Sequence, residues 1–382
     1  MRRATRRKQV VVITGASAGV GRAAAREFAR EGARIALLAR GSEGLTAAAH
    51  EVEELGGSAL AIPCDVADPE DVEAAAARAE SAFGPIDVWV NNAMVSVFAP
   101  VHETTPAEYK RVTEVTYLGY VYGTLAALRR MRPRNRGTII FVGSALAYRG
   151  IPLQSAYCAA KHAMQGFFDS LRTELLHDKL NITLTAVHLA AMNTPQFRWS
   201  RSKMPLEPQP VPPIFQPEVA ARAVVYAAHH RRREIFVGSP TVTAIIGNRI
   251  APWFADRYLA RTGYRSQMSR EPHAPGRPDN LYEPLPGDAG AHGVFGRRAT
   301  PHSIQTWLAL HRPQLMVGAS FLAGIAASAL ITRDLSQDRP ASSPPPRPRN
   351  EPSPAHPPTP RSRRCGPAAA HPVARGAGSP RQ

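Results

Sequence analysis

Short apolar stretches rich in β-branched residues alternate with longer segments of helical periodicity over the first 240 residues or so. Several stretches are apolar on both faces, which is typical of strands covered by helices on either side. Two helix starts are marked by a capping residue before a proline, Asp68-Pro69 and Thr105-Pro106. The predicted strands are Val10–Thr14, Arg34–Ala39, Ala59–Ile62, Asp87–Val90, Thr138–Val142, Thr183–Leu189 and Glu234–Val237.

This order of strands and helices predicts an α/β fold with a doubly wound parallel sheet, because right-handed crossovers place helices on both faces. We expect one dinucleotide-binding and catalytic domain over residues 9–264, which ends near Gly263 and follows a basic arm at 1–8. A Pro/Gly-rich extension without clear periodicity covers 265–314. Thirteen prolines in the last 47 residues predict a disordered Pro/Arg-rich tail at 336–382.

Between the extension and the tail lies an apolar run without a charge, residues 315–331. Seventeen helical residues span about 25 Å, slightly less than a hydrocarbon core of ~30 Å. Ser320, Gly324 and Ser328 repeat at intervals of four, a spacing of helices that pack in membranes. Two interpretations stay open: a membrane anchor that holds the domain on the cytoplasmic side, or a packing helix in a soluble dimer. Both flanks are basic, so the orientation in a membrane is also open.

The net charge of +17 is concentrated at the two ends, which carry eleven of the seventeen charges. Such tails attract any anionic surface, lipid or nucleic acid, and say little about the folded part. No zinc site or recognition motif supports a nucleic-acid binder, so no nucleic-acid partner is expected. The three cysteines have neither metal nor disulfide spacing, and no apolar stretch follows the basic N-terminus as in a signal peptide. We therefore expect a cytoplasmic protein without a metal.

A glycine-rich segment, Thr14–Gly21 ("TGASAGVG"), follows the first strand and opens the first helix. Glycines there permit a tight turn and let the backbone approach a pyrophosphate, which a helix N-terminus attracts. An ordinary strand-to-helix turn is the alternative, but the context is the one that dinucleotide binding requires. The candidate cofactor contacts in this segment are Gly15, Ser17, Ala18, Gly19, Val20 and Gly21.

Arg40 ends the second strand, where an acid would hold the ribose 2′-hydroxyl of NAD. A cation there accommodates the 2′-phosphate of NADP, so NADP is the expected cofactor, with NAD as the alternative. Arg40 could instead be a plain surface arginine at a strand end.

A tyrosine lies four residues before a lysine in "SAYCAAKHAM", which places Tyr157 and Lys161 on one helical face. A nearby ammonium favours the ionised phenol, so Lys161 is expected to lower the pKa of Tyr157. Such a phenol can exchange a proton with an alcohol or a carbonyl. Ser144 lies thirteen residues earlier, at the carboxyl end of a strand where such folds bind ligands. The three residues together favour a catalytic site over an incidental pattern.

These motifs in this order resemble the short-chain dehydrogenase/reductase superfamily, in its glycine-loop and "YxxxK" form. The similarity runs from about Lys8 to Val237 and includes Asp65 after the third strand and "NNA" at 91–93. It implies a Rossmann fold and an oxidoreductase that interconverts a carbonyl and an alcohol by hydride transfer.

By this resemblance, Tyr157 is the general acid/base, Ser144 positions the substrate oxygen, and Lys161 binds the nicotinamide ribose. The resemblance further implies cofactor contacts at Asp65, Val66, Asn91, Ala93 and Thr194. Asn91 could instead only cap a strand end, and Asp65 could only start a turn. Family members commonly form dimers or tetramers, here through the helices expected at 106–131 and 154–177.

Three positions depart from the family pattern. Met94 stands where a glycine is usual, Thr116 replaces the asparagine of the proton relay, and Ala190-Ala191 replaces a proline-glycine pair. A threonine reaches less far than an asparagine, so a water could complete the relay. These departures motivate the alternative function, a dinucleotide-binding regulatory or scaffold protein with little or no turnover.

The segment 193–216 is expected to cover the substrate. It offers the side chains of Phe197, Trp199, Met204, Leu206 and Phe215. These side chains predict an apolar carbonyl or alcohol substrate, unless they simply pack on the sheet.

Overall fold

A computed structural model describes residues 8–312 of the chain. The expected basic arm (all but Lys8), the apolar run 315–331 and the tail 336–382 lie outside the described residues. Within residues 8–312, no helix is both long enough and apolar enough to cross a lipid bilayer. Anchorage through 315–331 therefore stays a prediction.

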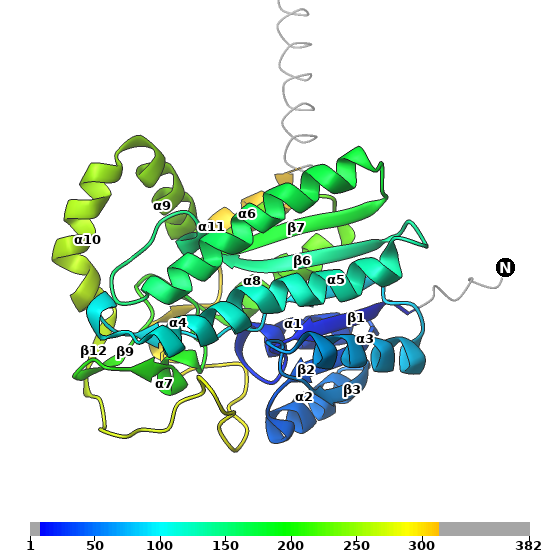
Figure 1. The fold of residues 1–382 in the computed structure, drawn as a ribbon, viewed down its shortest axis with the longest axis horizontal. Helices are drawn as coiled ribbons and strands as arrows, with labels where there is room; N and C mark the ends of the chain where they lie inside the picture. The colour runs from blue at the N-terminus through cyan, green and yellow to red at the C-terminus, as the bar shows by residue number, and fades with distance from the viewer. Residues whose placement is uncertain (1–7, 313–382) are drawn as a thin grey trace, which may run out of the picture. The chain divides into compact units, whose positions relative to one another are not determined.

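The central sheet has seven parallel strands in the order β11-β7-β6-β4-β1-β2-β3 (Figure 1). The predicted doubly wound parallel sheet is confirmed, and each predicted strand is found to within two residues. Strand order reverses between β1 and β4, which is where open sheets of this kind bind ligands. The strands are β1 (Val10–Thr14), β2 (Arg34–Ala39), β3 (Ser58–Pro63), β4 (Val88–Asn91), β6 (Gly137–Ser144), β7 (Ile182–Leu189) and β11 (Glu234–Val237).

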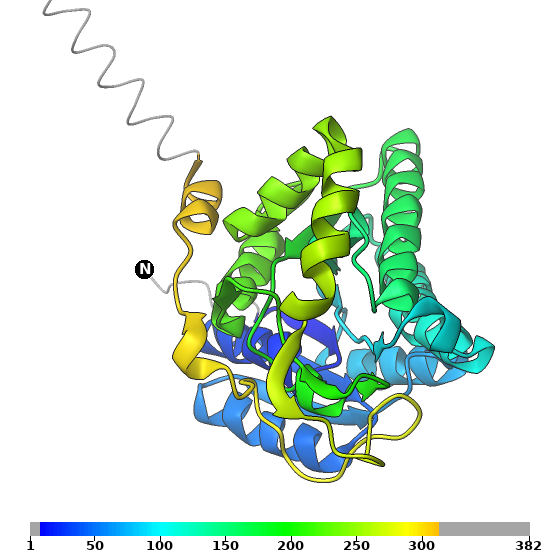
Figure 2. The same cartoon turned by 90° about the vertical axis from the view of Figure 1, so that its left-hand side faces the viewer.

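Helices cover both faces of the sheet (Figures 1 and 2). Alternating side chains of β1 show why, since Val10 and Val12 pack into one apolar core while Val11 and Ile13 pack into the other. The first core lies under α3 (Pro69–Phe83), α5 (Gly119–Met131) and α6 (Ser155–His177). The second lies under α1 (Gly19–Arg30), α2 (Ser42–Glu54) and α8 (Pro217–His229).

The helix expected over 106–131 is interrupted. It consists of α4 (Pro106–Thr113), a π-helical turn at Glu114–Leu118 and then α5. Thr116 lies in this turn, fully buried, and its hydroxyl accepts from Val95 N–H at 3.1 Å and donates to the Val95 carbonyl at 3.0 Å. Such turns are frequent at functional sites because they redirect side chains within a helix.

The segment after β7 forms short elements and a helical hairpin at one end of the sheet. The short elements are α7 (Gln196–Trp199), β8 (Arg201–Ser202), which pairs with β5 (Val97–Phe98), β9 (Leu206–Pro208) and β10 (Ile214–Phe215). The hairpin consists of α9 (Ser239–Ile250) and α10 (Pro252–Ser266), which bow away from the sheet in Figure 1. We call residues 239–266 the hairpin.

The extension after the hairpin packs on the domain. β12 (Met268–Pro272) pairs with β9, β13 (Ala299–Thr300) pairs with β10, and α11 (Ile304–Leu310) contacts β11. The side chain of Leu281 is fully buried in the core under α3, α5 and α6. Hydrophobic burial therefore holds a segment that shows no periodicity.

Replacement of Leu281 by alanine should destabilise the protein by about 2–5 kcal/mol, because it leaves a cavity in the core. Val294 is 58% exposed in the same extension. Val294→Ala should therefore change the free energy of unfolding by no more than about 0.5 kcal/mol. Urea denaturation of the full chain measures both values. Equal effects of the two variants would show that the extension does not contribute to the core.

Candidate active site

A cavity of about 920 Å³ opens at the carboxyl ends of the strands. It extends from the glycine loop at β1 to the hairpin, and its walls include parts of the segment 193–216, which we call the lid, and of the extension. Most of the predicted site residues line it: Gly15, Ser17, Ala18, Gly19, Val20, Arg40, Asp65, Val66, Ala93, Ser144, Tyr157, Lys161 and Thr194. Gly21, Asn91 and Thr116 are not among the lining residues.

The glycine loop needs glycine for two reasons, its backbone angles and one close contact. Gly15 and Gly19 have φ of +66° and +56°, which glycine adopts without steric cost. A Cβ on Gly21 would collide with the carbonyl oxygen of Gly15. Gly21 therefore contributes by letting the loop close tightly on the first turn of α1, although it does not line the cavity. This cradle fits a dinucleotide pyrophosphate, which would lie at the N-terminus of α1.

Hydrogen bonds between β1 and β4 hold the loop in place. The Thr14 hydroxyl donates to the Val90 carbonyl and accepts from the N–H groups of Asn92 and Ala93 at 2.9 and 3.1 Å. The Asn92 amide donates to the carbonyls of Thr14 at 2.9 Å and Gly15 at 3.2 Å.

Asn91 points the other way. It accepts from the Trp89 indole at 2.9 Å and donates to the Thr124 hydroxyl of α5 at 3.1 Å. The residue that supports the loop is thus Asn92. Strand alternation could have shown this, because consecutive side chains leave a strand on opposite faces.

Lys161 is almost fully buried in the wall of the cavity. Its ammonium donates to the Tyr120 hydroxyl at 2.9 Å and to the Val142 carbonyl at 2.8 Å. Burial lowers the pKa of Lys161 to about 7, because a charged group is costly to remove from water. The sequence analysis did not identify Tyr120 as a partner of Lys161. The one signal in the sequence that could have suggested it is its position four residues after Thr116.

Tyr157 and Ser144 meet at the same end of the cavity. Burial raises the pKa of Tyr157, and a hydrogen bond with Ser144 opposes this rise only in part. The Lys161 nitrogen lies 5.7 Å from the centre of the Tyr157 ring. The expected lowering of the Tyr157 pKa by Lys161 is not observed, because desolvation dominates and the ammonium is directed to other oxygens. The phenol is therefore held in its protonated form, as a proton donor requires.

Ser144 ends β6, and its hydroxyl accepts from the Leu146 N–H at 3.1 Å. This bond fixes the serine at the start of a short 3₁₀ turn, Ala145–Ala147. Thr116 does not join this group, since its hydroxyl is committed to the backbone of Val95. Met94, which departs from the family pattern, lines the cavity.

At the opposite end of the cavity, Arg40 and Asp65 are both held by partners. The Arg40 guanidinium donates to the carbonyls of Asn280 and Tyr282 at 2.5 and 2.6 Å. Asp65 accepts from the Ala67 N–H at 3.0 Å and pairs with Arg111 at 2.6 Å. Asp65 thus starts a turn, which was the alternative interpretation of this residue from the sequence. It also lines the cavity.

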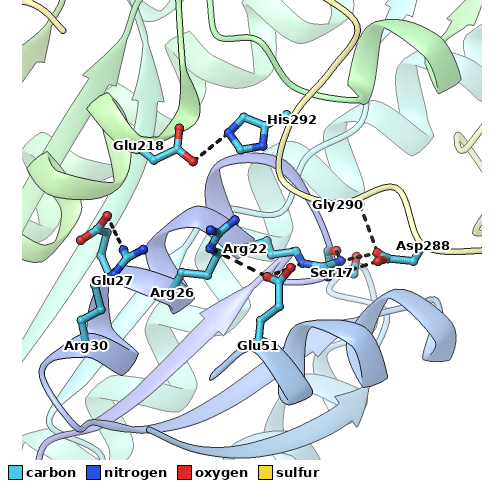
Figure 3. A network of polar contacts seen from close by, with 10 residues as sticks. All are labelled: Ser17, Arg22, Arg26, Glu27, Arg30, Glu51, Glu218, Asp288, Gly290 and His292. Atoms are coloured by element: carbon cyan, nitrogen blue, oxygen red, sulfur yellow. Dashed lines mark hydrogen bonds and ion pairs between the residues drawn. The ribbon is translucent and has the colours of Figure 1, made fainter. Parts of the chain in front are cut away.

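Residues 280–293, which we call the strap, lie across the glycine loop (Figure 3). Gly19 N–H donates to the Gly290 carbonyl at 3.1 Å. The buried Arg22 is held between Glu51 of α2, at 3.0 Å, and Asp288 of the strap. Burial alone would lower the pKa of Arg22, but Glu51 and Asp288 outweigh burial and hold the pKa above its ordinary value. At the end of the strap, His292 pairs with Glu218 of α8 at 2.8 Å.

The lid expected over 193–216 contributes only part of its apolar side chains to the cavity. Phe197 and Trp199 line it, whereas Met204, Leu206 and Phe215 do not. Thr194 is almost buried and lies where a Cβ on Gly19 would approach it within 3.3 Å. The strap holds this segment as well, because Gly293 N–H donates to the Asn193 carbonyl at 3.1 Å.

No group of three or more His, Cys, Asp or Glu side chains within the described range 8–312 has the arrangement of a metal site.

Residues 9–205 match the profile of the short chain dehydrogenase family, which is more than half of the chain. The chain belongs to this family. Members of this short-chain dehydrogenase family are NAD(P)-dependent oxidoreductases, and the fold and the Ser144–Tyr157–Lys161 arrangement agree with that membership.

Three relatives illustrate the similarity. Uncharacterized oxidoreductase YxnA of Bacillus subtilis (strain 168) is 34% identical over 329 residues, covering 85% of this chain and 91% of that protein. A match of that length includes the extension. Dehydrogenase/reductase SDR family member 7B of Bos taurus is 31% identical over 282 residues, with 70% and 85% coverage. The 3-dehydrosphinganine reductase of Danio rerio is 34% identical over 223 residues, with 56% and 67% coverage.

Among solved structures, a metagenomic short-chain oxidoreductase in complex with NADP is 29% identical and superposes with a TM-score of 0.51. The superposition covers 60% of this chain and 96% of that one.

The buried ammonium of Lys161 should make stability depend on pH. The unfolded chain keeps this proton up to a pKa of about 10.5, whereas the folded protein releases it near 7. Between these values the unfolded state binds more protons, so stability rises with pH, by at most about 1.4 kcal/mol per pH unit.

Lys161→Met removes this contribution. Relative to wild type, the variant should therefore be more stable at pH 7 than at pH 10. Thermal unfolding at both pH values measures the difference, and a difference that is independent of pH would contradict the lowered pKa.

Proposed function

We propose that this short-chain dehydrogenase interconverts an apolar carbonyl compound and its alcohol with NADP as cofactor and Tyr157 as general acid/base. One observation carries the proposal: Ser144, Tyr157 and Lys161 line one end of a cavity whose other end is the glycine loop. The remaining wall includes Met94, Phe197 and Trp199, which suits an apolar substrate.

The residues have distinct roles in this proposal. The bound nicotinamide supplies or accepts the hydride. Tyr157 donates its proton to the carbonyl oxygen during reduction and takes the proton back during oxidation, while Ser144 positions that oxygen. The Lys161 nitrogen lies 5.7 Å from the centre of the Tyr157 ring, and its pKa of about 7 allows it to carry a proton or to release one near neutral pH.

The cofactor end fits a dinucleotide. The glycine loop would hold the pyrophosphate, and Asp65 and Val66 would flank the adenine. Arg40 supports the choice of NADP, because this arginine is among the residues that line the cavity and would be within reach of a 2′-phosphate. The structural neighbour that was solved with NADP gives the same indication. NAD stays the alternative cofactor.

Thr116 is proposed to act by position rather than as a relay. Its hydroxyl is already bonded to the Val95 backbone, so it shapes the π-helical turn beside the site. A dinucleotide-binding protein without turnover is the competing function. It is favoured if the variants below change cofactor binding while wild type shows no reaction with any carbonyl or alcohol.

Self-association through α5 and α6 is a further part of the proposal. Leu125 and Leu176, on these two helices, are 45% and 66% exposed, which leaves apolar surface for a second copy.

Tyr157→Phe should lower turnover by about 10²–10⁴-fold, because the phenyl ring cannot donate a proton. NADPH binding should change little, since the glycine loop and Arg40 are untouched. Absorbance at the nicotinamide wavelength, over a panel of apolar carbonyls and alcohols, measures turnover, and fluorescence titration measures binding. Tyr226→Phe on α8 makes the same chemical change away from the cavity and should keep full turnover. Wild-type turnover in Tyr157→Phe would reject the proposed acid.

Arg40→Asp should shift the NADPH/NADH preference towards NADH by roughly 10- to 100-fold. The arginine would form charge-assisted hydrogen bonds with the 2′-phosphate, worth about 1.5–3 kcal/mol, and the aspartate would repel it. Arg40→Lys retains the positive charge and should retain NADPH preference. The ratio of kcat/KM for the two cofactors is the measurement. An unchanged ratio in Arg40→Asp would show that Arg40 serves only to hold the strap.

A further inference from the structure

The hairpin exposes an apolar surface that the rest of the described chain does not cover. Of its 28 residues, Thr241 in α9 and Gly263 in α10 are buried. Five of its large apolar and aromatic side chains are more than half exposed: Ile246 (52%), Ile250 (77%), Trp253 (60%), Phe254 (57%) and Tyr258 (55%). Figure 1 shows the hairpin bowing away from the sheet. Several large exposed apolar side chains on one hairpin indicate an interaction site.

The active-site cavity opens through this surface. Ile250, Phe254 and Tyr258 are more than half exposed and also line the cavity. A substrate that enters between them would pass from the apolar face of the hairpin to the end of the cavity that holds Ser144 and Tyr157. Whatever contacts the hairpin therefore also controls the entrance.

The charge on the hairpin is positive. Arg249, Arg257, Arg261 and Arg265 are exposed, and Arg257 lies over the Trp253 ring at 5.7 Å. The acid of the hairpin, Asp256, is already paired with Arg149 at 2.6 Å. An arginine-rich surface with exposed tryptophan, tyrosine and aliphatic side chains matches the interfacial region of a bilayer with anionic headgroups.

We propose that the hairpin docks on an anionic lipid surface and places the mouth of the cavity at that surface. α9 and α10 have 12 and 15 residues, too few to span the hydrocarbon core, so the hairpin lies in the interface. The link to substrate entry rests on the proposed function, because an apolar carbonyl compound partitions into lipid. The docking itself does not depend on turnover.

Two other occupants fit less well. A second copy that binds the same surface across a two-fold axis would bring the exposed arginines of both copies together and repel them. The Pro/Arg-rich tail 336–382 has a net charge of +6 and would be repelled for the same reason. A bilayer accepts the apolar side chains and attracts the arginines.

A fluorescent label on the hairpin of the full-length protein tests the proposal. Cys64 and Cys158 are buried, so Cys365→Ser combined with Ile250→Cys gives one reactive thiol. An environment-sensitive dye there should shift to the blue when phosphatidylcholine vesicles containing phosphatidylserine are added, and much less with phosphatidylcholine alone. The matched control, His50→Cys, places the dye at an exposed residue of α2, on the side of the sheet away from the hairpin, and should not shift. Because no substrate is involved, failure of the proposed reaction would leave this result unchanged.

A second pair of substitutions tests the charge. Arg257→Gln with Arg261→Gln should raise the amount of phosphatidylserine vesicles needed for half of the shift by roughly 30-fold, at about 1 kcal/mol per arginine. Arg129→Gln with Arg132→Gln, on the side away from the hairpin, should leave it unchanged.

Three results would overturn the proposal. The first is vesicle binding without a shift at position 250, which would assign binding to another segment. The second is a shift that follows protein concentration without vesicles, which would assign the surface to a second copy. The third is a dye that is blue-shifted from the start and insensitive to vesicles, which would show that the chain covers its own hairpin.

Discussion

The Thr14 hydroxyl joins the ends of β1 and β4 at the point where strand order reverses. Its bonds to Val90, Asn92 and Ala93 tie the ends of these two paired strands together, at the point where the glycine loop begins. The cavity, the approach of Gly21 to the Gly15 carbonyl and the first turn of α1 all depend on this junction. One buried hydroxyl thereby sets the geometry of the cofactor end.

Much of the fold follows from local patterns. The strands are predictable because each is a short apolar run between helices. A run that is apolar on both faces is typical of a parallel strand with helices on either side of the sheet. Ser144, Tyr157 and Lys161 are predictable for a similar reason, since strand ends and helical spacing fix where they lie. For Asn91 and Asn92 the pattern identified the segment but not which asparagine faces the loop.

What the sequence could not reveal depends on contacts between distant residues. The strap has no periodicity, and its position follows from the burial of Leu281 and from Asp288 meeting Arg22, 266 residues away in sequence. The direction of the Lys161 ammonium depends on Tyr120 and on the depth of burial, so its effect on Tyr157 differed from what helical spacing suggested. Desolvation is a property of the packed protein and has no local signature.

The strap also links the cofactor to the stability of the extension. Arg40 and Gly19, which lie where a dinucleotide would be held, each bond to the strap. A dinucleotide held at these residues would lie beside the strap, and wherever it had to pass the strap these bonds would have to open first, which is a local unfolding event. Cofactor binding and the stability of the extension would then be coupled, because both depend on the same bonds to the strap.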